Sequence, residues 1–312
     1  MNECKRYLVV TLDTEPDCDI RWKRSDPLTF SSITIGIPQI LRPIWNEYAI
    51  NPVYFVSPEV IENDACIKIL KKEADLGAEI GAHLHPEYIE PEKKYTNYEG
   101  TETQEYACST YSNEIECKKI ENLTKLIIKN LETRPVSYRA GKYGADLATI
   151  QTLEKLGYKI DSSVTPGIDW SAWGGPNHSK ALHQPYHISK ENYYVQSEKE
   201  NSIGILEVPI TIYDKRLGPF GKLLPNTWHF YSCLRPTYMS VFEEKLLVRK
   251  MIRQHKDVDK LVLNLMFHPM EIMPRRTPFV KSKFGQRLYV RRLKKTLNYL
   301  KRKQFRSKTL AQ

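Results

Sequence analysis

Short apolar runs that suit β-strands alternate with amphipathic helical patterns along the chain, and this alternation restricts the possible fold most strongly. Strands separated by helices pair in parallel, so we expect an α/β fold with a barrel-like sheet and helices outside it. At 312 residues, one barrel domain spanning residues 1–312 is the simplest organisation, with long loops at about 86–112 and 165–200. The seven expected strands cover residues 6–13, 53–56, 78–83, 136–139, 158–162, 203–209 and 261–267.

Ionisable residues gather where these strand-like runs end. In parallel barrels the active site lies on the loops that follow the carboxyl ends of the strands. We therefore expect the side chains at five strand ends to meet at one face of the sheet. They are Asp13 and Glu15, His83 and His85, Arg139, Asp161, and His268.

Two of these strand ends together suggest a metal site. His83 and His85 are two residues apart, so in an extended segment their side chains point the same way. Two imidazoles and a carboxylate form a ligand set that leaves metal positions open for water and substrate. The alternatives are an acidic surface turn at Asp13 and Glu15 and histidines with a structural role.

The other strand ends could supply acid–base and binding groups. Arg139 could hold a catalytic carboxylate ionised, and His268, at the end of an apolar strand, suits a general acid. Asp161 or Asp169 could orient either residue, and the sequence does not choose between them. Aromatic rings on which a sugar could stack are Tyr143, Trp170, Trp173 and Trp228, although a place in the core is an equal alternative.

The order of these motifs resembles the NodB homology domain of carbohydrate esterase family four, over residues 6–300. The motifs are the acidic strand end at 13–15, E-I-G-A-H at 79–83, R-A-G at 139–141, D-S-S-V-T-P at 161–166 with D-W at 169–170, and His268 after an apolar run. The resemblance implies a distorted seven-stranded barrel and metal-dependent removal of acetyl groups from amino sugars. By position it makes Asp13 the general base, Glu15 and His83 metal ligands, Arg139 the tether of the base, and His268 the general acid.

Two departures from the family pattern both concern the metal. The family's T-F-D-D becomes Thr11-Leu12-Asp13-Thr14-Glu15, so the second carboxylate comes one residue later. The family's H-x-x-x-H becomes His83-Leu84-His85-Pro86-Glu87, with Glu87 where a second histidine is expected. We favour His85 as the third ligand, because Pro86 can turn the chain inward, and Glu87 is the alternative.

The sequence thus predicts hydrolysis of an N-acyl group, most simply N-acetyl, from an amino sugar in a glycan or glycan precursor. One divalent ion would serve, with zinc expected and cobalt or nickel as alternatives. A same-fold amidase acting on a small non-sugar amide, or a catalytically silent glycan-binding protein, are the rival interpretations. Neither a G-x-S-x-G motif nor a phosphate-binding glycine-rich loop points to a serine hydrolase or an NTPase.

The net charge of +10 comes from the end of the chain. Residues 281–312 hold twelve Lys or Arg and no acidic residue, and without these charges the remainder carries −2. We therefore expect no nucleic-acid partner, but a basic helix at about 285–303 that could meet an anionic lipid carrier or membrane surface. No signal peptide pattern is visible and the six cysteines form no C-x-x-C pair, which predicts free thiols and a cytoplasmic protein. A peripheral position at the inner face of the membrane is the alternative.

Overall fold

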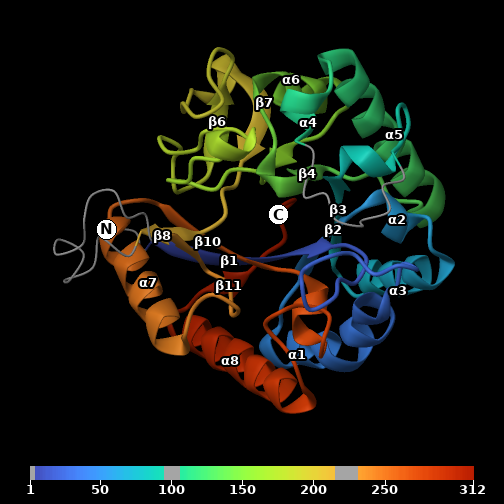
Figure 1. Cartoon of the computed structure of the whole chain (residues 1–312). Coiled ribbons are helices and arrows are strands. Elements are labelled where there is room, and N and C mark those ends of the chain that lie inside the picture. Colours follow the sequence, from blue (N-terminus) through green and yellow to red (C-terminus); the bar gives the residue numbers. More distant parts are fainter. Residues whose placement is uncertain (1–3, 95–105, 215–230) are drawn as a thin grey trace.

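The main element of the fold is one curled, mostly parallel sheet with helices around its outside (Figure 1). The structure is a computed structural model that describes residues 4–94, 106–214 and 231–312. The strand order is β10-β1-β2-β3-β4-β5-β7-β6, with β11 paired to β1. Neighbours from β10 to β7 are parallel, whereas β6 runs antiparallel to β7.

The strands of this sheet are β1 (Lys5–Thr14), β2 (Pro52–Val56), β3 (Glu79–Leu84), β4 (Ser137–Ala140), β5 (Ile160–Asp161), β6 (Tyr186–Ser189), β7 (Ser202–Glu207), β10 (Lys260–Phe267) and β11 (Arg306–Ser307). A separate antiparallel pair is formed by β8 (Ile212–Asp214) and β9 (Tyr231–Cys233).

The α-helices are α1 (Arg42–Tyr48), α2 (Pro58–Ile61), α3 (Asp64–Asp75), α4 (Ala107–Thr110), α5 (Asn113–Leu131), α6 (Leu147–Lys155), α7 (Val241–Gln254) and α8 (Lys283–Arg302). A π-helical segment, η1 (Ser32–Leu41), leads into α1, and short 3-10 turns include η2 (Pro86–Tyr88), η3 (Gly141–Tyr143), η4 (Ser171–Trp173), η5 (Lys199–Asn201) and η8 (Pro269–Ile272).

The predicted α/β fold is confirmed, but a seven-stranded barrel describes the sheet incompletely. All seven expected strands form, and an eighth, β6, lies inside the segment 165–200 that we predicted to be a loop. Within the described ranges, no strand pairing joins β6 or β7 to β10, so the sheet is a half-barrel. Isolated hydrogen bonds bridge this side, such as Thr211 N–H to the Asn264 carbonyl at 3.2 Å and Asn264 N–H to Thr211 Oγ1 at 2.8 Å. Of the other predicted loop, 86–112, residues 95–105 lie outside the described part of the chain.

Alternation along β1 separates the two faces of the sheet. Leu8, Val10 and Leu12 join the large apolar cluster under the helices. Val9 belongs to a second cluster with Val53 and Leu310, on the other face. Since side chains alternate along a strand, Asp13 shares the face of Val9 and so projects toward the concave side of the sheet.

The chain ends close to β1. After α8, residue Lys308 donates its N–H to the Leu8 carbonyl at 3.0 Å, and the C-terminus lies near the middle of the curled sheet (Figure 1). The predicted basic helix at 285–303 is α8, and its Leu293, Leu297 and Leu300 are buried, whereas Leu288 on the expected docked face is 45% exposed.

All six cysteines are free thiols, as predicted. Among the described residues, none of the helices combines the length and the apolar character that crossing a bilayer requires.

Candidate metal centre

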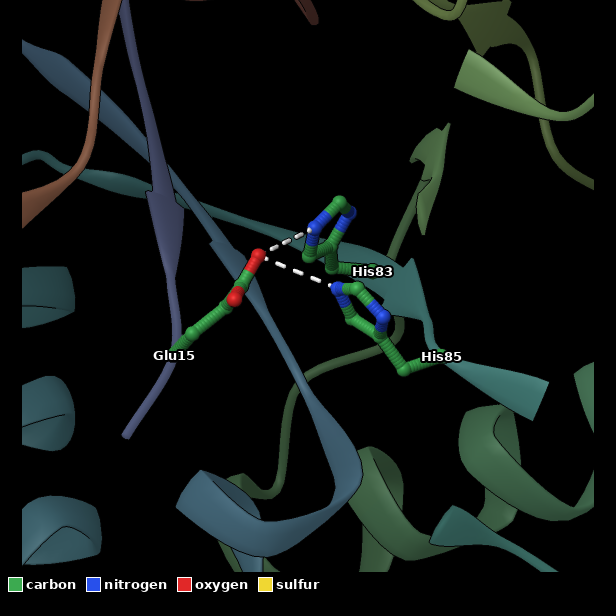
Figure 2. Close-up of side chains that lie close together, drawn as sticks. All are labelled: Glu15, His83 and His85. Atoms are coloured by element: carbon green, nitrogen blue, oxygen red, sulfur yellow. Dashed lines mark hydrogen bonds and ion pairs between the residues drawn. The ribbon is translucent and has the colours of Figure 1, made fainter. Parts of the chain in front are cut away.

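One carboxylate oxygen of Glu15 lies among three histidine rings at the carboxyl ends of β1, β3 and β10. Glu15 Oε1 is 3.0 Å from His83 Nε2, 3.1 Å from His85 Nε2 and 3.7 Å from His268 Nε2. Figure 2 shows the first two contacts, with both imidazole edges directed at the same oxygen. Glu15, His83 and His85 also form a group whose ligand atoms all lie within 4.8 Å of one another, the ligand set that the sequence favoured.

The hydrogen bonding of His83 makes its Nε2 a suitable ligand atom. Its Nδ1 lies 2.9 Å from the carbonyl oxygen of Arg139, the residue beside it in the register of β3 and β4. A carbonyl only accepts, so Nδ1 carries the proton and Nε2 of the neutral ring presents a lone pair toward Glu15. His83 Nε2 and Glu15 Oε1 are then both hydrogen-bond acceptors, 3.0 Å apart. Such a contact is favourable only if a proton or a metal ion lies between the two atoms.

His85, rather than Glu87, belongs to this cluster. Pro86 keeps the residue before it extended, at φ −103° and ψ 103°, so the two histidines project together and their rings lie 4.9 Å apart. Glu87 Oε1 is 3.8 Å from the other nitrogen of His85, Nδ1, and so lies behind the ring. Gly141 leaves room for this arrangement, because a Cβ there would lie 2.5 Å from the Leu84 carbonyl and 3.0 Å from His85 Nδ1.

Asp13 and Arg139 form a buried ion pair, with Nη1 of Arg139 2.6 Å from Oδ1 of Asp13. The guanidinium also donates to the Ser162 carbonyl at 2.8 Å and to Thr11 Oγ1 at 3.0 Å, which fixes its orientation. Burial raises the pKa of Asp13, but the charge and hydrogen bond of Arg139, together with the charge of His268, outweigh it and hold the pKa below its usual value. Asp13 is therefore ionised at neutral pH.

His268 is held by a pair that the sequence analysis missed, Arg235 and Glu271. Glu271 accepts from the backbone N–H of His268 at 2.6 Å and lies 3.1 Å from its Nδ1. Arg235 forms a bidentate ion pair with Glu271, at 2.6 and 3.1 Å. A signal was present, because proline at the first helical position and glutamate two residues later mark a helix start at His268.

A second missed pair, Arg24 and Glu59, lies on the other side of Glu15. Arg24 pairs with Glu59, and its Nη2 is 3.8 Å from the second carboxylate oxygen of Glu15. The guanidinium also lies over the ring of Tyr88, 3.9 Å from its centre.

The charges around the histidines do not cancel. Five carboxylates and three guanidinium groups leave two negative charges when the histidines are neutral: Asp13, Glu15, Glu59, Glu87 and Glu271 against Arg24, Arg139 and Arg235. Burial lowers the pKa of His85 and of His268, but Glu15, together with Glu87 for His85 and Glu271 for His268, outweighs it and raises both pKa values to about 9. The protein thus favours two added positive charges here, which two protons or one divalent ion would supply.

The remaining predicted site residues lie outside this cluster. Asp161 accepts from Ser163 Oγ at 2.7 Å and from the Tyr193 hydroxyl, and Asp169 accepts from Asn177 Nδ2 at 2.8 Å on an exposed turn. Over the described part of the chain, neither carboxylate bonds to Arg139 or His268, so the suggestion that Asp161 or Asp169 orients them is wrong.

Two of the predicted aromatic residues stack on one another, and a third is exposed beside them. The rings of Tyr143 and Trp170 are 5.9 Å apart at 30°, and Trp173 is 68% exposed next to Trp170. Trp228 lies outside the described residues. Lys142 and Tyr143 both have positive φ, 55° and 64°, an uncommon conformation that is enriched at functional sites.

Comparison with known proteins identifies the fold. No family model and no curated protein sequence matches the chain. Among solved structures, a protein of the glycoside hydrolase/deacetylase type from Parabacteroides distasonis matches 96% of this chain and 68% of its own, at 11% identity and a TM-score of 0.67. The chain has this type of fold.

Two other solved structures also match nearly the whole chain. A GH57-type branching enzyme from Pyrococcus horikoshii matches 98% of this chain and 69% of its own, at 10% identity and a TM-score of 0.55. A family 4 acetyl xylan esterase from Clostridium thermocellum, solved in complex with a cobalt ion, matches 98% and 89%, at 13% identity and a TM-score of 0.43. At these identities, the likeness to the two structures with TM-scores of 0.67 and 0.55 establishes the fold and leaves the reaction to the site.

Proposed function

We propose that the chain is a metal-dependent hydrolase that removes an N-acyl group, most simply acetyl, from an amino sugar. The observation that carries this proposal is the convergence of three imidazole Nε2 atoms on one oxygen of Glu15. The buried Asp13–Arg139 pair stands at the end of the same strand as Glu15. This combination offers metal ligands, a proton acceptor and a proton donor at one face of the sheet.

The residues present fit a divalent ion. Glu15, His83 and His85 would hold it, through one carboxylate oxygen and two Nε2 atoms, while Glu87 and the Arg139 carbonyl orient the two imidazoles from behind. A divalent ion of the zinc type at such a site supplies Lewis acidity, which polarises an amide carbonyl and makes water more acidic. We expect zinc, with cobalt or nickel as alternatives.

Asp13 and His268 carry out the proton transfers. Asp13 is ionised and tethered, so it can accept the proton of an attacking water molecule. His268, with its pKa raised to about 9, is protonated at neutral pH and can donate to the departing amine nitrogen. Glu271 and Arg235 keep the ring of His268 in place while the proton moves.

An amino sugar is the proposed substrate because aromatic rings accompany the site. Tyr143 follows β4 directly, and its stacked partner Trp170 with the exposed Trp173 offers a face for a sugar ring. Asp161 and Asp169 then serve as supports of the loops that carry these rings, through the contacts of Asp161 with Ser163 and of Asp169 with Asn177.

The metal is tested first. We would measure metal content by elemental mass spectrometry in the wild type, in the His83→Ala, His85→Ala double variant, and in His255→Ala, which alters a histidine at the far end of α7. About one ion per chain in the wild type and in His255→Ala, with none in the double variant, is expected. No ion in the wild type after exposure to zinc, cobalt or nickel would refute the proposal and favour a glycan-binding protein.

The reaction is tested next, with the metal-loaded protein. We expect acetate release from N-acetylglucosamine oligosaccharides that stops on chelation and in Asp13→Asn. Release from small non-sugar amides alone would identify an amidase of the same fold. Binding of the oligosaccharides without release of acetate, with metal present, would refute catalysis.

A further inference from the structure

Several exposed apolar side chains lie in segments that follow β1 and β10 or lead into α7. They are found between β1 and η1, in the first turn of η1, between β9 and the first turn of α7, and between β10 and the second turn of α8. Their exposed fractions run from 40% to 68%. We call this set the apolar rim: Ile20, Leu28, Ile35, Tyr238, Phe242, Phe279, Phe284 and Leu288.

From the chain topology, we place these residues at the end of the sheet where the parallel strands have their carboxyl ends. The helices α7 and α8 flank β10 in the chain, and in a parallel sheet such helices begin at the carboxyl ends of the strands. Phe279 links the rim to the site, because its ring lies 5.4 Å from Tyr238 and 5.5 Å from Trp22. Trp22 in turn meets the ring of His268 edge-on at 5.5 Å.

Basic side chains are interleaved with the apolar ones. The chain has no acidic residue from position 272 to its end. Exposed cations on the rim segment are Arg275, Lys281, Lys283, Arg287 and Arg291. The carboxylates in the neighbouring parts of the rim are Asp19, which is paired with Arg21 at 2.9 Å, Asp26, and Glu243, which caps α7. The rim is therefore apolar and net positive.

We propose that the apolar rim docks this end of the chain on an anionic membrane surface. Aromatic and leucine side chains enter the boundary between headgroups and acyl chains, and neighbouring lysines and arginines meet anionic headgroups. Phe284 and Leu288, one helical turn apart at the start of α8, would enter together, with Lys283, Arg287 and Arg291 beside them.

The charges favour a membrane over other occupants. A second copy of the chain would bring the same positive surface against itself in a twofold dimer, and like charges repel. The phosphates of a nucleic acid would pair with the basic side chains, but a nucleic acid offers little apolar surface for Phe284 and Leu288. The docking does not depend on the reaction at the metal centre, so it is tested without an activity measurement.

The test is flotation of the full chain with vesicles of phosphatidylcholine alone or with 30% phosphatidylglycerol. The wild type should float with the anionic vesicles and much less with neutral ones. Arg287→Gln, Arg291→Gln should weaken binding about 25-fold, from about fivefold per basic residue near an anionic surface. Phe284→Ser, Leu288→Ser should weaken it tenfold or more, because each exposed side chain loses its apolar contact. Leu76→Ser, Val195→Ser, two residues each 48% exposed outside the rim, should bind like the wild type.

Several results would overturn the proposal. Equal flotation of the wild type with neutral and anionic vesicles would overturn it. Unchanged vesicle binding of both rim variants would also overturn it. If the wild type self-associates in sedimentation and only the rim variants are monomeric, a second copy covers the rim instead. Circular dichroism of each variant verifies that these exposed substitutions leave the fold intact.

Discussion

Replacing Arg139 by methionine should destabilise the chain strongly through a single uncompensated charge. The guanidinium is fully buried and pairs with Asp13, which is itself almost fully buried. Removing one partner of a buried ion pair costs about 3–5 kcal/mol. The Ser162 carbonyl loses its 2.8 Å donor as well, which adds about 1 kcal/mol or more. We therefore expect the free energy of unfolding at pH 7 to fall by about 4 kcal/mol or more in urea titrations.

A second substitution distinguishes the charge from the loss of packing. Arg139→Met combined with Asp13→Asn leaves no unpaired carboxylate at position 13, so it should recover at least about 2 kcal/mol of the lost stability. The pKa of Asp13 is lowered in the folded state, so the wild type loses this stability as the pH falls and Asp13 becomes protonated. The difference in the free energy of unfolding between the wild type and Arg139→Met should therefore become smaller in acid. A fall in the free energy of unfolding of less than about 1 kcal/mol for Arg139→Met would refute this reasoning. A double variant no more stable than Arg139→Met would refute it as well.

Three further predictions concern single carboxylates. Burial raises the pKa of Glu116 to about 7, so the folded state loses stability as pH rises from 4.5 toward 7. Glu116→Gln should therefore raise the free energy of unfolding at pH 8 by about 3 kcal/mol with no gain at pH 4, and equal gains at both pH values in urea titrations would contradict this. Glu271→Gln removes a charge that helps to raise the pKa of His268 to about 9, so the alkaline limb of kcat/KM should move to lower pH; an unmoved limb would mean that another group donates the proton. Glu87→Gln should retain metal with about 10- to 100-fold lower affinity, whereas His85→Ala should lose it on dialysis; equal loss would make Glu87 a ligand.

The sequence predicted the parts of the fold that rest on local patterns. Each of the seven expected strands has an apolar run long enough to recognise, and α8 covers the expected basic helix at about 285–303. The strand β6 escaped notice because Tyr186–Ser189 alternates over only four residues inside a polar segment. The pairing of the chain end with β1 is a contact across nearly the whole sequence, which no local pattern records.

The candidate site was predictable where its residues follow strands. The placement of Glu15, His83 and His85 together required only that β1 and β3 be parallel neighbours of β2. Arg24 could not be predicted in this way, because it lies in an irregular segment and no local sequence pattern indicates its ion pair with Glu59. We expected Asp161 at the site, but its side chain projects from the face of the sheet opposite to that of Ser162. It is Ser162 that accepts hydrogen bonds from Arg139, through its carbonyl and hydroxyl oxygens.

The bond from His83 to the Arg139 carbonyl has a consequence for how such a chain can diversify. It joins a proposed metal ligand to the backbone of the next strand, in the same register that aligns the core of the sheet. A change of register would displace the proposed ligands and the core together, so selection on folding would also protect the proposed chemistry. New substrate preferences would then arise by exchange of the segments after β1 and β5, which carry Trp22 and Trp170 and leave that register untouched.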